Sequence, residues 1–97
     1  MKLEKIKILV VDDEEGMCKL LKEILREEGY AATTCGSPEQ ALQKLDDGNF
    51  DIAIVDIKMP GMNGIEFLTR SKEISPSMDV IMITAYGSIE NAVESIK

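Results

Sequence analysis

The chain has 97 residues, of which 44% are hydrophobic, and this length predicts one compact domain with no room for a second core. Its net charge of -7 argues against direct binding to nucleic acid phosphates, and its apolar runs are far shorter than the roughly 20 residues that cross a membrane. We therefore expect a soluble, cytoplasmic protein that contacts neither nucleic acid nor membrane directly.

The residue types narrow the possible chemistry. The chain contains no histidine, which is the commonest general base and the commonest ligand of transition metals. Its two cysteines, Cys18 and Cys35, match no zinc or thioredoxin-like spacing, so neither a disulfide framework nor a thiolate metal site is expected. Any chemistry must therefore depend on carboxylates.

The first strand and helix are predicted at the start of the chain. Residues 6–11 form a β-branched run that becomes wholly apolar, which is typical of a strand covered on both faces, and the run stops at Asp12. Apolar residues at helical spacing follow, and Gly29 stands where a left-handed residue would end that helix. The apolar positions of this helix are Met17, Leu20, Leu21, Ile24 and Leu25.

Three further strands alternate with helices. Residues 30–35 resemble a shorter strand, and Ser37, Pro38 and Gln40 provide a capping serine, a first-turn proline and a glutamine that closes a capping box. A buried strand over 52–55 ends at Asp56, turn residues fill 60–64, and a helix with Ile65, Phe67 and Leu68 comes next. A fourth strand over 80–83 ends at Thr84, and Ser88 is predicted to cap a last helix.

The alternation of strands and helices predicts an α/β fold with an open, doubly wound parallel sheet. Ligands of such sheets bind outside the carboxyl ends of the strands, near the point where the strand order reverses. The residues at those ends are Asp12, Asp13, Asp56 and Thr84.

Three carboxylates in one cleft favour a bound cation. Two unit charges about 4 Å apart repel by roughly 4 kcal/mol at an effective dielectric constant near 20. Because all the candidate ligands are oxygen atoms, a hard ion is expected, and we predict Mg²⁺ with tolerance of Mn²⁺. The alternative is that Asp12, Asp13 and Asp56 are ordinary loop or helix-cap acids.

Three segments resemble the receiver domains of bacterial two-component response regulators, the CheY-like superfamily. They are Val-Val-Asp-Asp-Glu-Glu at 10–15, Asp-Ile-Lys-Met-Pro-Gly-Met-Asn-Gly at 56–64, and Thr84-Ala85. The stretch at 85–93 most resembles receivers of nitrogen-regulation-type AAA+ transcription activators. The resemblance implies a flavodoxin/CheY-like sheet with strand order 2-1-3-4.

The resemblance also implies a role for each site residue. Asp56 would take a phosphoryl group from a sensor histidine kinase, and Asp12, Asp13, Asp56 and the Lys58 backbone carbonyl would hold Mg²⁺. The Thr84 hydroxyl and the Ala85 backbone amide would bind the phosphoryl group and switch a surface read by an output domain or partner regulator. Lys58 and Tyr86 would tune dephosphorylation. The protein would not be an enzyme beyond Mg²⁺-dependent self-phosphorylation and dephosphorylation.

The chain departs from the family pattern after the last predicted helix. The pattern includes a fifth strand, a phosphoryl-binding lysine at its end and a fifth helix, whereas Lys97 belongs to the last helical pattern. We therefore expect residues 1–97 to be a receiver domain that is incomplete at its C-terminus and has no lysine of this type. The exposed edge of the fourth strand would then invite homodimerisation or strand exchange.

Two other functions are considered. A phosphatase-like or flavin-binding protein is disfavoured because acidic residues, instead of a glycine-rich phosphate cradle, follow the first strand, and because Lys58 stands where aspartyl phosphatases keep a second acid. A pseudo-receiver, which would be an interaction module that accepts no phosphate, remains the alternative because the lysine is missing.

Overall fold

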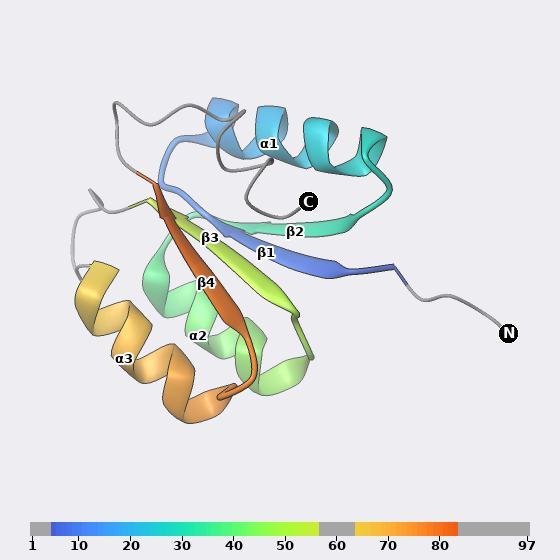
Figure 1. The fold of residues 1–97 in the computed structure, drawn as a ribbon. Coiled ribbons are helices and arrows are strands. Elements are labelled where there is room, and N and C mark those ends of the chain that lie inside the picture. Colours follow the sequence, from blue (N-terminus) through green and yellow to red (C-terminus); the bar gives the residue numbers. More distant parts are fainter. Residues whose placement is uncertain (1–4, 57–63, 84–97) are drawn as a thin grey trace, which may run out of the picture.

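The computed structural model describes residues 5–56 and 64–83. Its four strands form one parallel sheet in the order β2-β1-β3-β4, with α1 on one face and α2 and α3 on the other (Figure 1). This confirms the doubly wound α/β fold and the strand order 2-1-3-4. The strands are β1 (Lys7–Val11), β2 (Ala31–Cys35), β3 (Ile52–Asp56) and β4 (Asp79–Ile83), and the helices are α1 (Glu15–Glu27), α2 (Pro38–Asp47) and α3 (Gly64–Ile74).

The central strands β1 and β3 are buried on both faces, as their apolar runs predict. Alternate residues of a strand point to opposite faces, so Leu9 and Val11 pack in the cluster on the side of α2 and α3. Ile8 and Val10 pack on the other side against α1. Each apolar layer therefore includes residues of β1, which fixes its register because a one-residue slip would exchange the two faces.

The strand order reverses between β1 and β3, and this is the point that positions the site. β1 pairs with β2 on one side and with β3 on the other, and Val11 lies opposite Val55 in the second pairing. The residues that follow these two positions are Asp12 and Asp56. Parallel pairing thus brings both carboxylates to the same end of the sheet.

Helix α1 covers one face, but its apolar stripe is narrower than its sequence suggests. Leu21 and Leu25 are fully buried with Ile8, whereas Leu20 is 45% exposed although it has helical spacing. Only one face of the helix packs against the sheet, so not every apolar residue of the helix is buried. Gly29 follows the helix with a φ of 93°, which confirms the predicted left-handed residue.

Helix α2 starts at the predicted cap, with one change in detail. The Ser37 Oγ accepts a hydrogen bond of 3.2 Å from the Gln40 backbone N–H, and Pro38 occupies the first turn. The Gln40 side chain accepts from the Gly36 backbone N–H at 3.2 Å and so closes on the residue before the cap. The glutamine therefore stabilises the helix start through Gly36, whereas a standard capping box would use Ser37.

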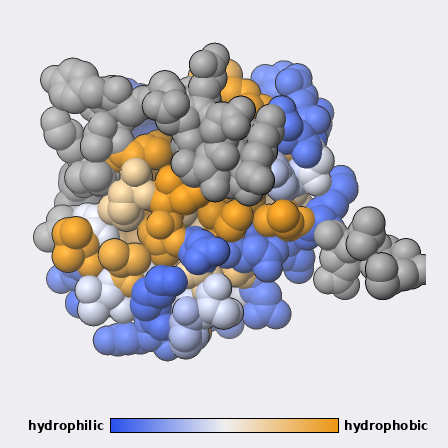
Figure 2. Space-filling view, in the orientation of Figure 1, coloured by the Kyte–Doolittle hydropathy of each residue, from blue (hydrophilic) through white to orange (hydrophobic). Residues whose placement is uncertain are grey.

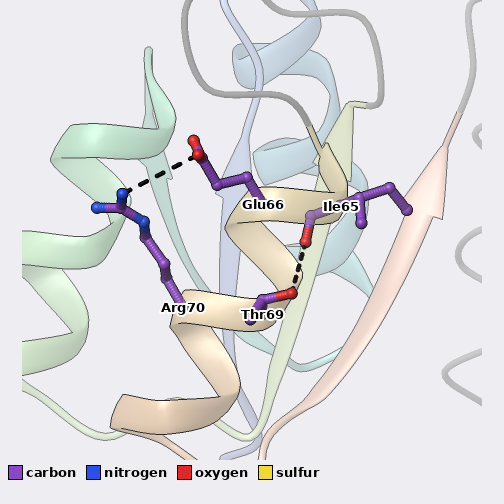
Figure 3. Close-up of polar contacts among 4 residues, drawn as sticks. All are labelled: Ile65, Glu66, Thr69 and Arg70. Carbon is purple, nitrogen blue, oxygen red and sulfur yellow. Dashed lines mark hydrogen bonds and ion pairs between the residues drawn. The ribbon is translucent and has the colours of Figure 1, made fainter.

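Helix α3 joins the apolar cluster beneath the sheet through Phe67, which is fully buried, while Ile65 is 71% exposed. Its outer surface carries two contacts between residues four positions apart (Figure 3). Arg70 Nη2 lies 4.0 Å from Glu66 Oε1, and the Thr69 hydroxyl donates to the Ile65 carbonyl at 3.1 Å. The ion pair adds a few tenths of a kcal/mol to a helix, and a threonine hydroxyl bonded to the carbonyl four residues earlier adds none, so the burial of Phe67 stabilises α3 more than either contact.

The edge strand β4 is less covered than the two central strands. Its residues from Val80 to Ile83 are half-buried, and Figure 2 shows hydrophobic residues across the middle of the face that β4 crosses. The last predicted helix, near Ser88, lies outside the described residues. Within the described part of the chain, no helix is both long and apolar enough to cross a membrane.

Candidate metal centre

Three aspartates meet at the carboxyl ends of β1 and β3. One carboxylate oxygen from each of Asp12, Asp13 and Asp56 lies within 4.8 Å of the other two. Asp12 is buried, Asp56 is half-buried and Asp13 is exposed, so the cluster opens to solvent at Asp13. The structure therefore brings together the three carboxylates that the sequence placed at these strand ends.

Asp12 is held by its main chain and by its side chain. Its backbone N–H donates to the Cys35 carbonyl at 3.1 Å, which continues the pairing of β1 with β2 by one residue. Its Oδ1 accepts a hydrogen bond of 2.9 Å from the Glu14 backbone N–H in the turn that leads into α1. Both contacts fix the direction of the Asp12 carboxylate before any ligand is present.

The electrostatics of the cluster oppose the ionised form of Asp12. Burial raises the pKa of Asp12, and the charges of Asp56 and Asp13 raise it further. The hydrogen bond from Glu14 acts in the opposite direction and lowers the pKa, but the net shift is upward. Negative charge is thus concentrated at the carboxyl ends of β1 and β3, and the hydrogen bond from Glu14 does not fully offset its effect on Asp12.

The donor set fits a hard divalent cation. All three groups are carboxylates, they lie close enough to share one ion, and a small ion such as Mg²⁺ takes one or two carboxylates and keeps several waters. A cation here would offset the repulsion that raises the pKa of Asp12. Soft metals would need thiolate or imidazole ligands, and the cluster contains neither.

A cavity of about 190 Å³ adjoins the cluster on the side of β2. Two buried thiols, Cys18 of α1 and Cys35 of β2, line it together with Asp12 and Asp13. Both cysteines are free, in agreement with the expected lack of a disulfide framework. Burial raises the pKa of both thiols, that of Cys35 to about 11, so both stay protonated near neutral pH.

Four other residues named from the sequence lie outside the described residues. They are Lys58, Thr84, Ala85 and Tyr86. The sequence did not predict one contact of the described site, in which the Cys18 thiol donates to the Asp12 carbonyl at 3.3 Å. The spacing of six residues, from a strand end to the inner face of the next helix, is the only sequence signal for it.

The family described as the response regulator receiver domain matches residues 8–97. Among curated proteins, the transcriptional regulatory protein ZraR of Klebsiella oxytoca is 42% identical over 94 residues, which cover 97% of this chain and 21% of that protein. The sporulation initiation phosphotransferase F of Bacillus subtilis is 42% identical over 89 residues, 92% of this chain and 72% of that protein. The chain thus spans about a fifth of the length of ZraR.

Solved structures show the same likeness in three dimensions. The response regulator protein TrrA of Thermotoga maritima, crystallised with Mg²⁺ and BeF, has a TM-score of 0.78 and 41% identity, over 94% of this chain and 79% of that one. TrrA in complex with the histidine kinase ThkA also has a TM-score of 0.78, with 43% identity over 86% of this chain and 72% of that one.

Proposed function

The chain belongs to the response regulator receiver family, and from this premise we propose that Asp56 accepts a phosphoryl group from a sensor histidine kinase. The observation that carries the proposal is the cluster of three carboxylates, whose oxygens lie within 4.8 Å of one another at the point where the strand order reverses. Structural acids have no need to converge in this way. Asp56 is the last residue of β3 and the first residue of the segment 56–64, which resembles the family signature.

The proposed reaction is a transfer between two protein groups. An oxygen of the Asp56 carboxylate attacks the phosphorus of a phosphohistidine, the P–N bond breaks, and the imidazole leaves with the electron pair and takes up a proton. The product is an acyl phosphate on Asp56. Dephosphorylation is the attack of water on the same phosphorus, so the proposed phosphoryl chemistry takes place at the protein's own aspartate.

Asp12, Asp13 and Asp56 would hold Mg²⁺, or Mn²⁺ in its place, together with the Lys58 backbone carbonyl. The bound ion supplies positive charge, which lowers the repulsion between the carboxylates and the incoming phosphoryl oxygens. The chain's own contribution is orientation, because the Glu14 backbone N–H and the Cys35 carbonyl fix Asp12 beside Asp56. The crystal structure of TrrA with Mg²⁺ and BeF supports this assignment by similarity.

The response to phosphorylation is proposed to start at the end of β4. The Thr84 hydroxyl and the Ala85 backbone amide would bind phosphoryl oxygens, and Lys58 and Tyr86 would set the access of hydrolytic water. β4 pairs with β3 so that Ile83 lies opposite Asp56, which puts Thr84 next in sequence to the partner of the phospho-acceptor. This register supports the assignment of Thr84.

The proposed partners are a sensor histidine kinase and an output domain or partner regulator. The complex of ThkA with TrrA supports the first, and the likeness to the transcriptional regulatory protein ZraR supports a role in transcription regulation through the second. With a net charge of -7, the chain itself is not proposed to contact nucleic acid. Residues 1–97 are proposed to act as a receiver domain in the cytoplasm.

Self-association through β4 is a further proposed property. Among the described strands, β4 pairs with β3 alone, and its apolar residues are half-buried. A second copy could pair with this edge or exchange a strand. Light scattering over a range of protein concentrations tests this, and a monomer at the highest concentration would contradict it.

The phospho-acceptor is tested by intact-mass spectrometry after incubation with acetyl phosphate, with Mg²⁺ and with EDTA. We expect a phosphoryl adduct only with Mg²⁺, at Asp56, and none in Asp56→Asn. The matched control is Asp51→Asn, the same substitution just before the other end of β3, which should keep the adduct. A folded wild-type protein that binds Mg²⁺ without forming an adduct would favour a phosphorylation-independent interaction module.

A further inference from the structure

The Cys18 thiol lies where the ends of β1 and β2 separate into loops. Its sulfur donates to the Asp12 carbonyl at 3.3 Å and lies 3.8 Å from the Cys35 carbonyl. The Cys35 carbonyl also accepts from the Asp12 backbone N–H at 3.1 Å. One buried side chain of α1 therefore contacts the carbonyl groups of both strand ends, and one of these belongs to a carboxylate residue of the site.

The Cys18 backbone is held in the first turn of α1. The Cys18 backbone N–H donates to the Glu14 carbonyl at 3.1 Å in the first turn of α1, so the thiol projects from a fixed point. From that point the thiol reaches back six residues to Asp12, which is itself bonded through its carboxylate to the Glu14 N–H. Asp13 lies between Asp12 and Glu14 in the sequence, so these contacts hold the backbone on both sides of it.

Cys18 could instead be only a small apolar residue that fills space, which is the usual role of a buried cysteine. Packing alone would make its loss a matter of stability. A hydrogen bond to the Asp12 carbonyl predicts something different, because residues that orient metal ligands change metal affinity when they are replaced. The two interpretations therefore differ in what a substitution changes.

We infer that Cys18 is a positioning residue, whose thiol holds the Asp12 carbonyl and thereby directs the Asp12 and Asp13 carboxylates toward a shared divalent cation. This inference rests on the metal site of the proposed function, and it assigns to α1 a part in that site. The cavity of about 190 Å³ beside Asp12 and Cys18 lets water reach the carbonyl when the thiol is absent. Truncation should therefore loosen the site while the domain still folds.

The test measures Mn²⁺ affinity by electron paramagnetic resonance on the full chain. Cys18→Ala should weaken Mn²⁺ binding about tenfold, and Cys18→Ser, which keeps a donor, should stay within about threefold of wild type. Cys18→Val fills the space without donating, so it should behave as alanine does and serves if the alanine variant does not fold. Cys35→Ala is the matched control, because it removes the other buried thiol of the cavity and keeps the carbonyl that Asp12 and Cys18 contact.

A second readout separates orientation from general damage. If Cys18 acts through the cation, raising the Mg²⁺ concentration should restore the rate of acetyl phosphate labelling in Cys18→Ala. Wild-type Mn²⁺ affinity in Cys18→Ala and Cys18→Val, or an equal loss in Cys35→Ala, would overturn the inference. Failure of the proposed function looks different, since wild-type protein would then bind Mn²⁺ with the expected dependence on Cys18 and still form no adduct at Asp56.

Discussion

Aspartates lie at both ends of the parallel sheet, and their surroundings differ. At the amino end, Asp51 accepts from the Lys7 backbone N–H through its Oδ2 at 2.8 Å, and its own N–H donates to the Lys7 carbonyl at 2.8 Å. Its carbonyl accepts from the Asp79 backbone N–H at 3.1 Å. The Asp51 carboxylate and backbone thus join the starts of β1, β3 and β4.

At the carboxyl end, three carboxylates lie close together. Asp12, Asp13 and Asp56 lie within 4.8 Å of one another, and burial together with this repulsion raises the pKa of Asp12. A backbone N–H donates to a carboxylate at both ends, from Lys7 to Asp51 and from Glu14 to Asp12, but among the described residues three carboxylates crowd together at the carboxyl end alone, where a cation would offset their repulsion. The crowding of acids, more than the position of an acid at a strand end, therefore indicates a metal site.

The largest expected difference between the two ends is in metal binding. Asp13→Asn removes a charged ligand and should lower Mg²⁺ affinity by about one to two orders of magnitude, whereas Asp51→Asn should leave the affinity unchanged. Isothermal titration calorimetry with Mg²⁺ measures both variants. Equal losses at the two ends would show that the cluster of three carboxylates is not the ion site.

The next effect concerns the buried thiol at the end of β2. The pKa of Cys35 is raised from 9.0 to about 11, mainly by burial, and a shift of this size corresponds to about 3 kcal/mol. Because the folded pKa is the higher one, this stability is present below pH 9 and is lost as the pH rises through 11. Urea unfolding should show the wild type losing up to about 2 to 3 kcal/mol more than Cys35→Ala over this range.

Parallel pH dependence in the two proteins would contradict the raised pKa of Cys35. The comparison uses a difference between two variants, so the titration of lysine and tyrosine, which both proteins share, cancels. Cys35→Ser is a further control, because serine keeps a small polar group but does not ionise in this range.

At the amino end, the expected effect is a loss of stability, and its size is that of one hydrogen bond. Asp51→Ala should lower the free energy of unfolding by about 1 to 2 kcal/mol, since it removes a charged acceptor from the Lys7 N–H at an exposed position. Glu23→Ala, at an exposed position of α1, is the control and should change stability by less than about 0.5 kcal/mol. Urea unfolding at neutral pH measures both, and similar values for the two would show that the Asp51 contact contributes little.

The sequence predicts much of this comparison because strand ends are easy to locate. Long apolar runs end at Asp12 and Asp56, and parallel pairing of their strands is enough to bring the two residues together. Leu20 and Ile65 show the limit of such reasoning, since helical spacing marks apolar residues but the packing against the sheet decides which are buried. Both are exposed, one on each side of the sheet.

Contacts that depend on the path of a loop were not predictable in the same way. The bond from Cys18 to the Asp12 carbonyl and the bond from Gly36 to Gln40 both arise where a strand turns into a helix, and residue spacing alone does not specify the partner in either bond. The roles of Lys58, Thr84, Ala85 and Tyr86 rest on family resemblance and stay predictions, because they lie outside the described residues.

The smallest expected effect is on the stability of Asp13→Asn, whose difference in urea midpoint from the wild type should change sign when Mg²⁺ is added. Asp13 is exposed, and its charge is one of the causes that raise the pKa of Asp12. In EDTA, Asp13→Asn should therefore raise the urea midpoint slightly, because it removes a repulsive charge from the carboxyl end of the sheet. In saturating Mg²⁺ the order should reverse, because the wild type binds the ion more tightly and gains stability from binding by mass action. Asp51→Asn should lower the midpoint under both conditions, so an Asp13→Asn variant that behaves in the same way would show that the two ends of the sheet use their carboxylates alike.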